Sequence, residues 1–203
     1  MDNYEIATIN ARGLFLKWDQ AKMIRKYRLE ADEKYLYIRF LGQKYRIVRE
    51  TGSVECIENG VQAADFSSVM TIYDYLCREN EMPGMCGKWT RIHSLKHAGQ
   101  TSPNDVKLYQ KHADYFQDRQ DALRYAAAQL GRPFPVGDIA VIFPLFDGMD
   151  GVFQFWEGDE EFPPSVRFMW DDNIHHYLKF ETIWYAAGKV FDLIYRHMRN
   201  FSG

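Results

Sequence analysis

The stretch YLYIRFLGQKYRIVRE, residues 35–50, constrains the fold more than any other part of the sequence. Apolar and polar residues alternate on both sides of Gly42, and this period of two is that of β-strands with one buried face. Glycine at the first position of a two-residue loop is typical of a type II′ turn, so Gly42 and Gln43 predict a β-hairpin that needs a second layer over its apolar face. The predicted cross-strand pairs are Phe40 with Tyr45, Ile38 with Ile47 and Leu36 with Arg49.

The opposite face of this hairpin is basic and rich in tyrosine: Tyr35, Tyr37, Arg39, Lys44 and Arg46. Aromatic and basic side chains on a sheet can stack on and neutralise single-stranded nucleic acid. The sequence signature of RNA-binding sheets does not accompany them, so packing or solvation is the preferred interpretation. A turn at residues 51–53 then leads to a third strand at residues 54–57 and completes a meander.

Segments with helical spacing surround the meander. Residues 4–31 predict an N-terminal helix with a break at Gly13, and Asp65 is placed to cap a helix that ends near residue 80. Ser102 and Pro103 begin a central helical region that Gly131 closes. The C-terminal helix, about residues 180–201, has this core stripe: Ile183, Ala187, Val190, Ile194 and Met198.

A second group of strands is predicted around these last helices. IAVIFPLF is nearly all apolar, as in a buried central strand, although Pro144 implies a bulge or a strand end. VFQFWE and SVRFMWD predict a hairpin, and GKWTRIHSL predicts a further strand. Together these patterns predict an α+β fold, in which antiparallel β-meanders pack with N-terminal, central and C-terminal helices in a single domain, residues 1–203.

Composition narrows the class of protein. A chain of 203 residues buries roughly 70% of its unfolded surface, so it needs no disulfide or metal for stability. No run reaches the ~20 apolar residues of a membrane span, and the acidic N-terminus is unlike a secretory signal. We therefore expect a cytoplasmic location and no membrane partner, and the net charge of −3 argues against nucleic acid as a partner.

Charge is segregated along the chain. Residues 17–49 hold ten Lys or Arg against four Asp or Glu, whereas residues 138–172 hold nine acidic residues against one Arg. Such asymmetry can mark a polyanion-binding patch. The interpretation we prefer is that the two surfaces neutralise each other, within the fold or across a homodimer.

The acidic region contains FWEGDEEFPPSVRFMWDDNIHH, which concentrates carboxylate and imidazole side chains. If its strands are residues 152–157 and 165–171, two groups of acids lie at opposite ends of the second strand, about 20 Å apart. The stretch therefore predicts two separate sites, a hairpin tip and a turn.

The hairpin tip is a candidate ligand-binding site formed by Asp159, Glu160 and Glu161. Glu160 and Glu161 are adjacent, so they point to opposite faces of an extended chain and cannot form a glycosidase pair by themselves. We expect Phe162 to anchor the loop in the core. The tip either presents carboxylates to a ligand or is structural, and the aromatic residues expected to line a ligand cleft are Trp89, Trp156 and Trp170.

The turn is a candidate metal site formed by Asp171, Asp172, His175 and His176. Carboxylate and neutral imidazole suit Zn, Fe or Mn, but further ligands would have to come from His93 or His97. The alternative, which we favour, is that an aspartate accepts backbone N–H groups in a turn.

Cysteine usage excludes one class of cofactor. Cys56, Cys77 and Cys86 show no C-x-x-C spacing, and a cysteine-only zinc or iron–sulfur site needs four thiolates, so we expect no iron–sulfur cluster. Cys86, beside a glycine, is the best nucleophile candidate, but the sequence identifies no base for it. The sequence does not decide whether the protein is an enzyme.

The segments FLGQKYRI, IYDYLCRENEMPGMCGKWTRIHSL and GDEEFPPSVRFMWDDNIHHYLKFE resemble an uncharacterised family, domain of unknown function 3786, mostly from anaerobic bacteria and archaea. The resemblance covers roughly residues 35–195, and GDEEFP is its most specific part. Some members are described as iron–sulfur proteins, and some lie near corrinoid or methyl-transfer genes. The first description requires a cysteine-rich segment that this chain lacks, so the resemblance implies a family without an established chemistry.

Three functional hypotheses follow. The leading one is a small-ligand-binding or accessory protein whose aromatic-lined cleft holds an organic or tetrapyrrole-like ligand, in keeping with the anaerobic cofactor or methyl-transfer metabolism that the resemblance implies. The second is a metal-dependent enzyme that uses the Asp/His turn. The third is a protein-interaction module or homodimer.

Overall fold

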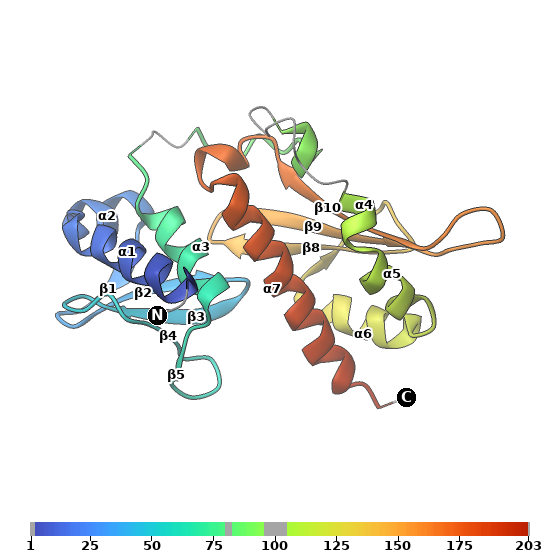
Figure 1. Ribbon diagram of the computed structural model, residues 1–203, viewed down its shortest axis with the longest axis horizontal. Coiled ribbons are helices and arrows are strands. Elements are labelled where there is room, and N and C mark those ends of the chain that lie inside the picture. The colour runs from blue at the N-terminus through green and yellow to red at the C-terminus, as the bar shows by residue number, and fades with distance from the viewer. Residues whose placement is uncertain (1–2, 80–82, 96–104, 203) are drawn as a thin grey trace.

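The computed structural model describes residues 3–79, 83–95 and 105–202 (Figure 1). The chain forms two five-stranded antiparallel sheets with helices packed against them, so the predicted α+β class is confirmed. The start of the central helical region, with Ser102 and Pro103, lies outside the described residues. None of the described helices is long and apolar enough to cross a membrane.

The first sheet is a meander whose strands follow one another in chain order. Two helices precede it and one follows it. The elements of this half are α1 (Asn3–Lys17), α2 (Gln20–Tyr27), β1 (Glu30–Ala31), β2 (Tyr35–Phe40), β3 (Gln43–Val48), β4 (Val54–Cys56), β5 (Gln62–Ala63) and α3 (Phe66–Leu76).

The β2–β3 hairpin was predicted with the correct faces and the wrong register. Leu41 and Gly42 form its loop, with φ of 51° and 74°, as in a type I′ turn, so Phe40 pairs with Gln43. This register differs from the predicted one by two residues, and side chains alternate with period two, so the same face is buried. The N–H of Leu41 donates to the carbonyl of Leu145 in the second sheet at 3.0 Å, and this contact holds a non-glycine residue in the left-handed region.

The N-terminal helical region breaks at residues 18–19, and the prediction of a break at Gly13 was wrong. The side chain of Asp19 accepts from the N–H of Lys22 and caps α2, whereas α1 continues through Gly13. The buried side chain of α1 is Phe15. At the next helix the predicted cap was correct, because Asp65 caps α3 through the N–H of Ser68, but α3 ends at Leu76 and not near residue 80.

The second sheet has the strand order β6-β10-β9-β8-β7. The predicted irregularity at Pro144 is a register shift between Pro144 and Phe146. The elements of this half are β6 (Trp89–Arg91), η1 (Ile92–Ser94), α4 (Asp105–Leu108), α5 (Gln110–Gln117), α6 (Gln120–Leu130), β7 (Arg132–Pro133), β8 (Ile139–Phe146), β9 (Met149–Trp156), β10 (Ser165–Asp171), η2 (Ile174–His176) and α7 (Phe180–Arg199).

Helix α7 joins the two halves, because it packs on both α3 and α6 (Figure 1). Its first turn is fixed by Asp74 of α3, whose Oδ2 accepts from the N–H of Lys179 and the hydroxyl of Thr182, both at 2.5 Å. The predicted core stripe of α7 is buried, and the buried residues of both sheets form one continuous cluster. Phe40 of the first sheet packs on Phe146 of the second, with ring centroids 5.2 Å apart.

Candidate functional site

Asp171 ends β10 and is 2% exposed. Its Oδ1 accepts hydrogen bonds from the N–H groups of Cys86 (3.1 Å) and Asn173 (3.0 Å), and its Oδ2 accepts from the N–H of Gly87 (2.7 Å). The thiol of Cys86 also donates to Oδ1, at 3.3 Å. Asp171 therefore fastens the loop before β6 to the turn after β10, which is the turn chemistry favoured from the sequence.

The ionisation of Asp171 follows from these contacts. Burial raises the pKa of this carboxyl, but the backbone N–H groups of Asn173, Cys86 and Gly87 outweigh burial and hold the pKa below its ordinary value of 3.8. Asp171 is therefore a carboxylate at neutral pH, and both of its oxygens are already used as acceptors.

The rest of this turn places two imidazoles side by side. His175 Nδ1 lies 3.0 Å from the backbone oxygen of Asp172, and the rings of His175 and His176 are 4.0 Å apart. In the part of the chain that the structure describes, no three His, Cys, Asp or Glu side chains are grouped so that they could hold a metal ion. His97 and the side chain of His93 lie outside the described residues, so metal binding here stays a prediction.

The β9–β10 hairpin tip extends away from the body of the molecule (Figure 1). Asp159 Oδ1 accepts from the N–H groups of Phe162 and Glu161, both at 2.8 Å, and these bonds hold the pKa of Asp159 below its ordinary value. Glu160 and Glu161 are exposed. Phe162 is 67% exposed, so the prediction that it anchors the loop was wrong. The tip reaches beyond the helices (Figure 1). The base of the tip is fixed to α5, because the side-chain oxygen of Gln117 accepts from the N–H of Gly158. Ligand binding by the tip stays a prediction.

The three tryptophans named as ligand contacts are divided between the two faces of the second sheet. Trp170 is 1% exposed and lies on the face that packs into the core. Trp89 pairs with Asp171 of β10, and Trp156 pairs with Ser165 of β10. Directly paired residues point to the same face of a sheet, so Trp89 and Trp156 lie on the face opposite Trp170. The structure does not bring the three side chains together.

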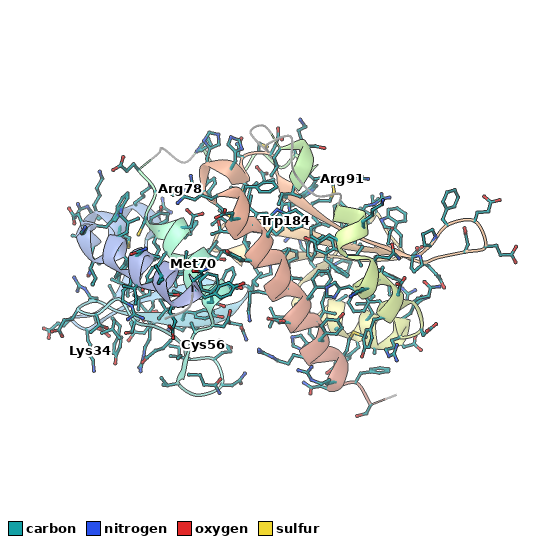
Figure 2. All side chains as sticks on the ribbon, in the orientation of Figure 1. Lys34, Cys56, Met70, Arg78, Arg91 and Trp184 are labelled. Atoms are coloured by element: carbon teal, nitrogen blue, oxygen red, sulfur yellow. The ribbon has the colours of Figure 1, made fainter. Side chains whose placement is uncertain are left out.

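A polar pocket that the sequence did not reveal lies between the edge of the first sheet and α7, with a volume of about 480 Å³. Cys56 of β4, labelled in Figure 2, belongs to its sheet side. The polar side chains that line the pocket are Gln43, Tyr45, Asn59, Gln62, Asp65, Lys189 and Arg196. These residues are far apart in the sequence, and the packing of α7 against the first half brings them together.

Lys189 lies in the wall of this pocket with its side chain only 12% exposed. Its Nζ is 3.0 Å from Asp65 Oδ2 and 3.0 Å from Asp192 Oδ2. Burial lowers the pKa of Lys189, but hydrogen bonds to Asp192 and Asp65 outweigh it and hold the pKa above its ordinary value. An ammonium group has three N–H donors, so one donor of Lys189 remains after these two bonds.

The pKa of Asp65 agrees with this arrangement. Burial raises the pKa of Asp65, but the ammonium of Lys189 and the N–H and hydroxyl of Ser68 outweigh it and hold the pKa below its ordinary value. Lys189 and Asp65 are therefore both charged at neutral pH, and Asp65 also keeps its role as the N-cap of α3.

Several donors at the pocket remain unused. The guanidinium of Arg196 and the side-chain amides of Asn59 and Gln62 make no hydrogen bond or ion pair with the residues that the structure describes. All three residues are exposed, so water satisfies these groups when nothing else is bound. A guanidinium presents a planar fork of donors that matches a carboxylate or a phosphate, so the pocket has the donors that an anionic group requires.

The fold and the site together define an α+β protein of two five-stranded antiparallel sheets joined by one helix, with a polar pocket at the junction. Over residues 19–192 the chain matches the family described as Domain of unknown function (DUF3786), and it belongs to that family. The match begins after α1, contains Asp65 and Lys189, and ends before Arg196. No curated protein and no solved structure matches the chain.

Proposed function

We propose that this protein binds a small polar ligand with an anionic group, a carboxylate or a phosphate, in the pocket between β3–β5 and α7. The observation that carries the proposal is Lys189, an ammonium group held in the pocket wall by two carboxylates, with a third donor that no described residue uses. Arg196, which has no ion pair among the described residues, lines the same pocket. Lysine is rarely buried unless it is paired, and two carboxylates fix this one in place. A preordered donor of this kind lowers the entropic cost of binding.

The pocket favours one class of ligand over another. Its volume of about 480 Å³ is within the range of small-molecule sites, roughly 300–1,000 Å³. Its lining is mainly polar, with Tyr45 as its aromatic member. These features support a compact polar anion rather than the tetrapyrrole-like ligand expected from the aromatic composition. The link to anaerobic cofactor or methyl-transfer metabolism stays a prediction.

Binding is tested by calorimetry and thermal shift with two probes, citrate and inorganic phosphate. Arg196→Ala should weaken binding of the better probe by about tenfold or more, because it removes a forked, charge-assisted contact. Arg196→Lys keeps the charge but not the fork, so it should have an intermediate effect. Neither change should alter stability, since Arg196 is exposed and has no ion pair among the described residues.

The matched control is Arg199→Ala, in the last turn of the same helix but outside the pocket. It removes the same charge and should leave the affinity nearly unchanged. If neither probe binds at millimolar concentration, or if the two alanine variants lose affinity equally, the proposal fails.

The metal-dependent enzyme hypothesis rests on a separate site and has a separate test. Elemental analysis of protein purified without chelator should find about one metal per chain if that hypothesis is correct. The residues concerned are Asp171, Asp172, His175 and His176.

A further inference from the structure

Helix α1 has an apolar face on each side. Its inner side packs on α3, where Tyr4 meets Phe66 with ring centroids 4.9 Å apart and Phe15 meets Tyr73 at 5.3 Å. Its outer side should be polar if water covered it, because surface helices carry their polar residues away from the core. Five large apolar side chains of α1 are exposed, and three of them lie on its outer side: Ile6 (43% exposed), Ile9 (50%) and Leu16 (42%).

The spacing of these residues is that of a helix–helix seam. Ile6, Ile9, Gly13 and Leu16 are separated by three, four and three residues, which is the a/d spacing of a heptad. A Cβ built on Gly13 would meet no atom within 4 Å. The outer stripe of α1 therefore consists of three large side chains and one open notch. We call it the α1 stripe.

We propose that the α1 stripe is a homodimer interface, in which α1 packs antiparallel on α1 of a second copy. The three-four-three spacing reads the same in both directions, so a two-fold axis between Ile9 and Gly13 superposes the stripe on itself. Ile9 of each copy then faces the notch at Gly13 of the other, and Ile6 faces Leu16. Each Ile9 side chain therefore fills the notch at Gly13 of the other copy, and the two Ile9 side chains do not contact each other.

The size of this interface sets the expected strength of the dimer. Helix α1 has 15 residues, so the seam is about 22 Å long at 1.5 Å per residue. One helix pair of this length buries less surface than the roughly 1,200 Å² at the lower end of stable complexes. We therefore expect a dimer that dissociates on dilution, with a dissociation constant in the micromolar range. This inference is independent of the ligand pocket, whose lining includes no residue of α1.

Sedimentation equilibrium over a concentration series tests the proposal. The wild-type chain should pass from monomer to dimer as its concentration rises. Gly13→Leu should remain monomeric, because its side chain fills the notch that receives Ile9. A Cβ at position 13 meets no atom within 4 Å, so we expect the monomer to fold normally, which circular dichroism checks. The matched control is Val61→Lys, which removes another exposed apolar side chain (58% exposed) away from α1 and should leave the dimer intact.

Disulfide trapping tests the register. In a Cys86→Ser background, the variants Ile9→Cys and Gly13→Cys are mixed in equal amounts and oxidised mildly. A cross-linked dimer should form rapidly in the mixture and slowly in either variant alone, because position 9 faces position 13 and not itself. A wild-type chain that is monomeric throughout the series overturns the proposal, and so does a dimer that Gly13→Leu leaves unchanged.

Discussion

At the scale of single residues, the acidic stretch is divided by the hydrogen bonds that each carboxylate already accepts. Asp171 is buried and accepts from three backbone N–H groups, whereas Asp159 is exposed and accepts from two. No such bond is seen for the side chains of Glu160 and Glu161 among the described residues. A contiguous run of acids in the sequence therefore contains structural carboxylates and solvated ones, and only the structure distinguishes them.

Replacing Asp171 by Asn should destabilise the fold by about 1–3 kcal/mol, because an NH₂ group then replaces an oxygen that accepts from a buried N–H. Urea unfolding at neutral pH measures the loss. Asp159→Asn is the matched control, since it changes the same atoms in an exposed loop, and it should leave the free energy of unfolding nearly unchanged. Equal effects of the two substitutions would contradict the structural role of Asp171.

The effect of Asp171→Asn should also depend on pH. The pKa of Asp171 lies below its ordinary value of 3.8 in the folded protein, so its contribution is complete above pH 3.8 and is lost as the pH falls through the lowered pKa. The stability difference between the wild type and the variant should therefore be constant from neutral pH to about pH 5 and shrink below pH 3.8. A difference that grows on acidification would reverse the sign of this linkage.

At the scale of secondary structure, glycines show how closely neighbouring elements approach. A Cβ on Gly151 of β9 would lie 2.4 Å from the ring of Phe143 on β8. Gly151→Ala should therefore cost about 1–3 kcal/mol through overpacking. Gly13→Ala is the matched control, because it enters open space within a helix and should change stability by less than about 1 kcal/mol, in the favourable direction. Urea unfolding of dilute protein compares them, and equal losses would contradict the packing at Gly151.

The same scale shows what the sequence predicts and what it does not. Alternation identified the buried face of the β2–β3 hairpin, because a register error of two residues preserves the face. The register itself depends on Leu41, which bonds to a strand about one hundred residues later, and no local pattern contains that contact. The ligand pocket is a similar case, since Lys189 and Arg196 are ordinary residues of a helix until Asp65 and the first sheet lie beside them.

At the scale of the whole molecule, the two sheets depend on one helix and one continuous core, so we expect a single unfolding transition. Ile47→Val in the first sheet should lower stability by about 0.5–1.5 kcal/mol. Three of the five tryptophans, Trp89, Trp156 and Trp170, lie in the second sheet. In a Trp18→Phe background, tryptophan fluorescence and circular dichroism should therefore report the same shift in dilute protein. If Ile47→Val left the midpoint of the fluorescence transition unchanged, the two halves would unfold separately.

The position of α7 across both sheets also determines what happens when the chain is divided. A cut between α3 and β6 leaves α7 with the second half, so the first fragment keeps three helices and a sheet but exposes the face of α3 that α7 covers. Such fragments need one another to complete their interiors, and each is expected to aggregate when it is made alone. The two halves of this protein are therefore parts of one folding unit rather than exchangeable modules. Neither half can be transferred to another protein without α7, the helix that they share.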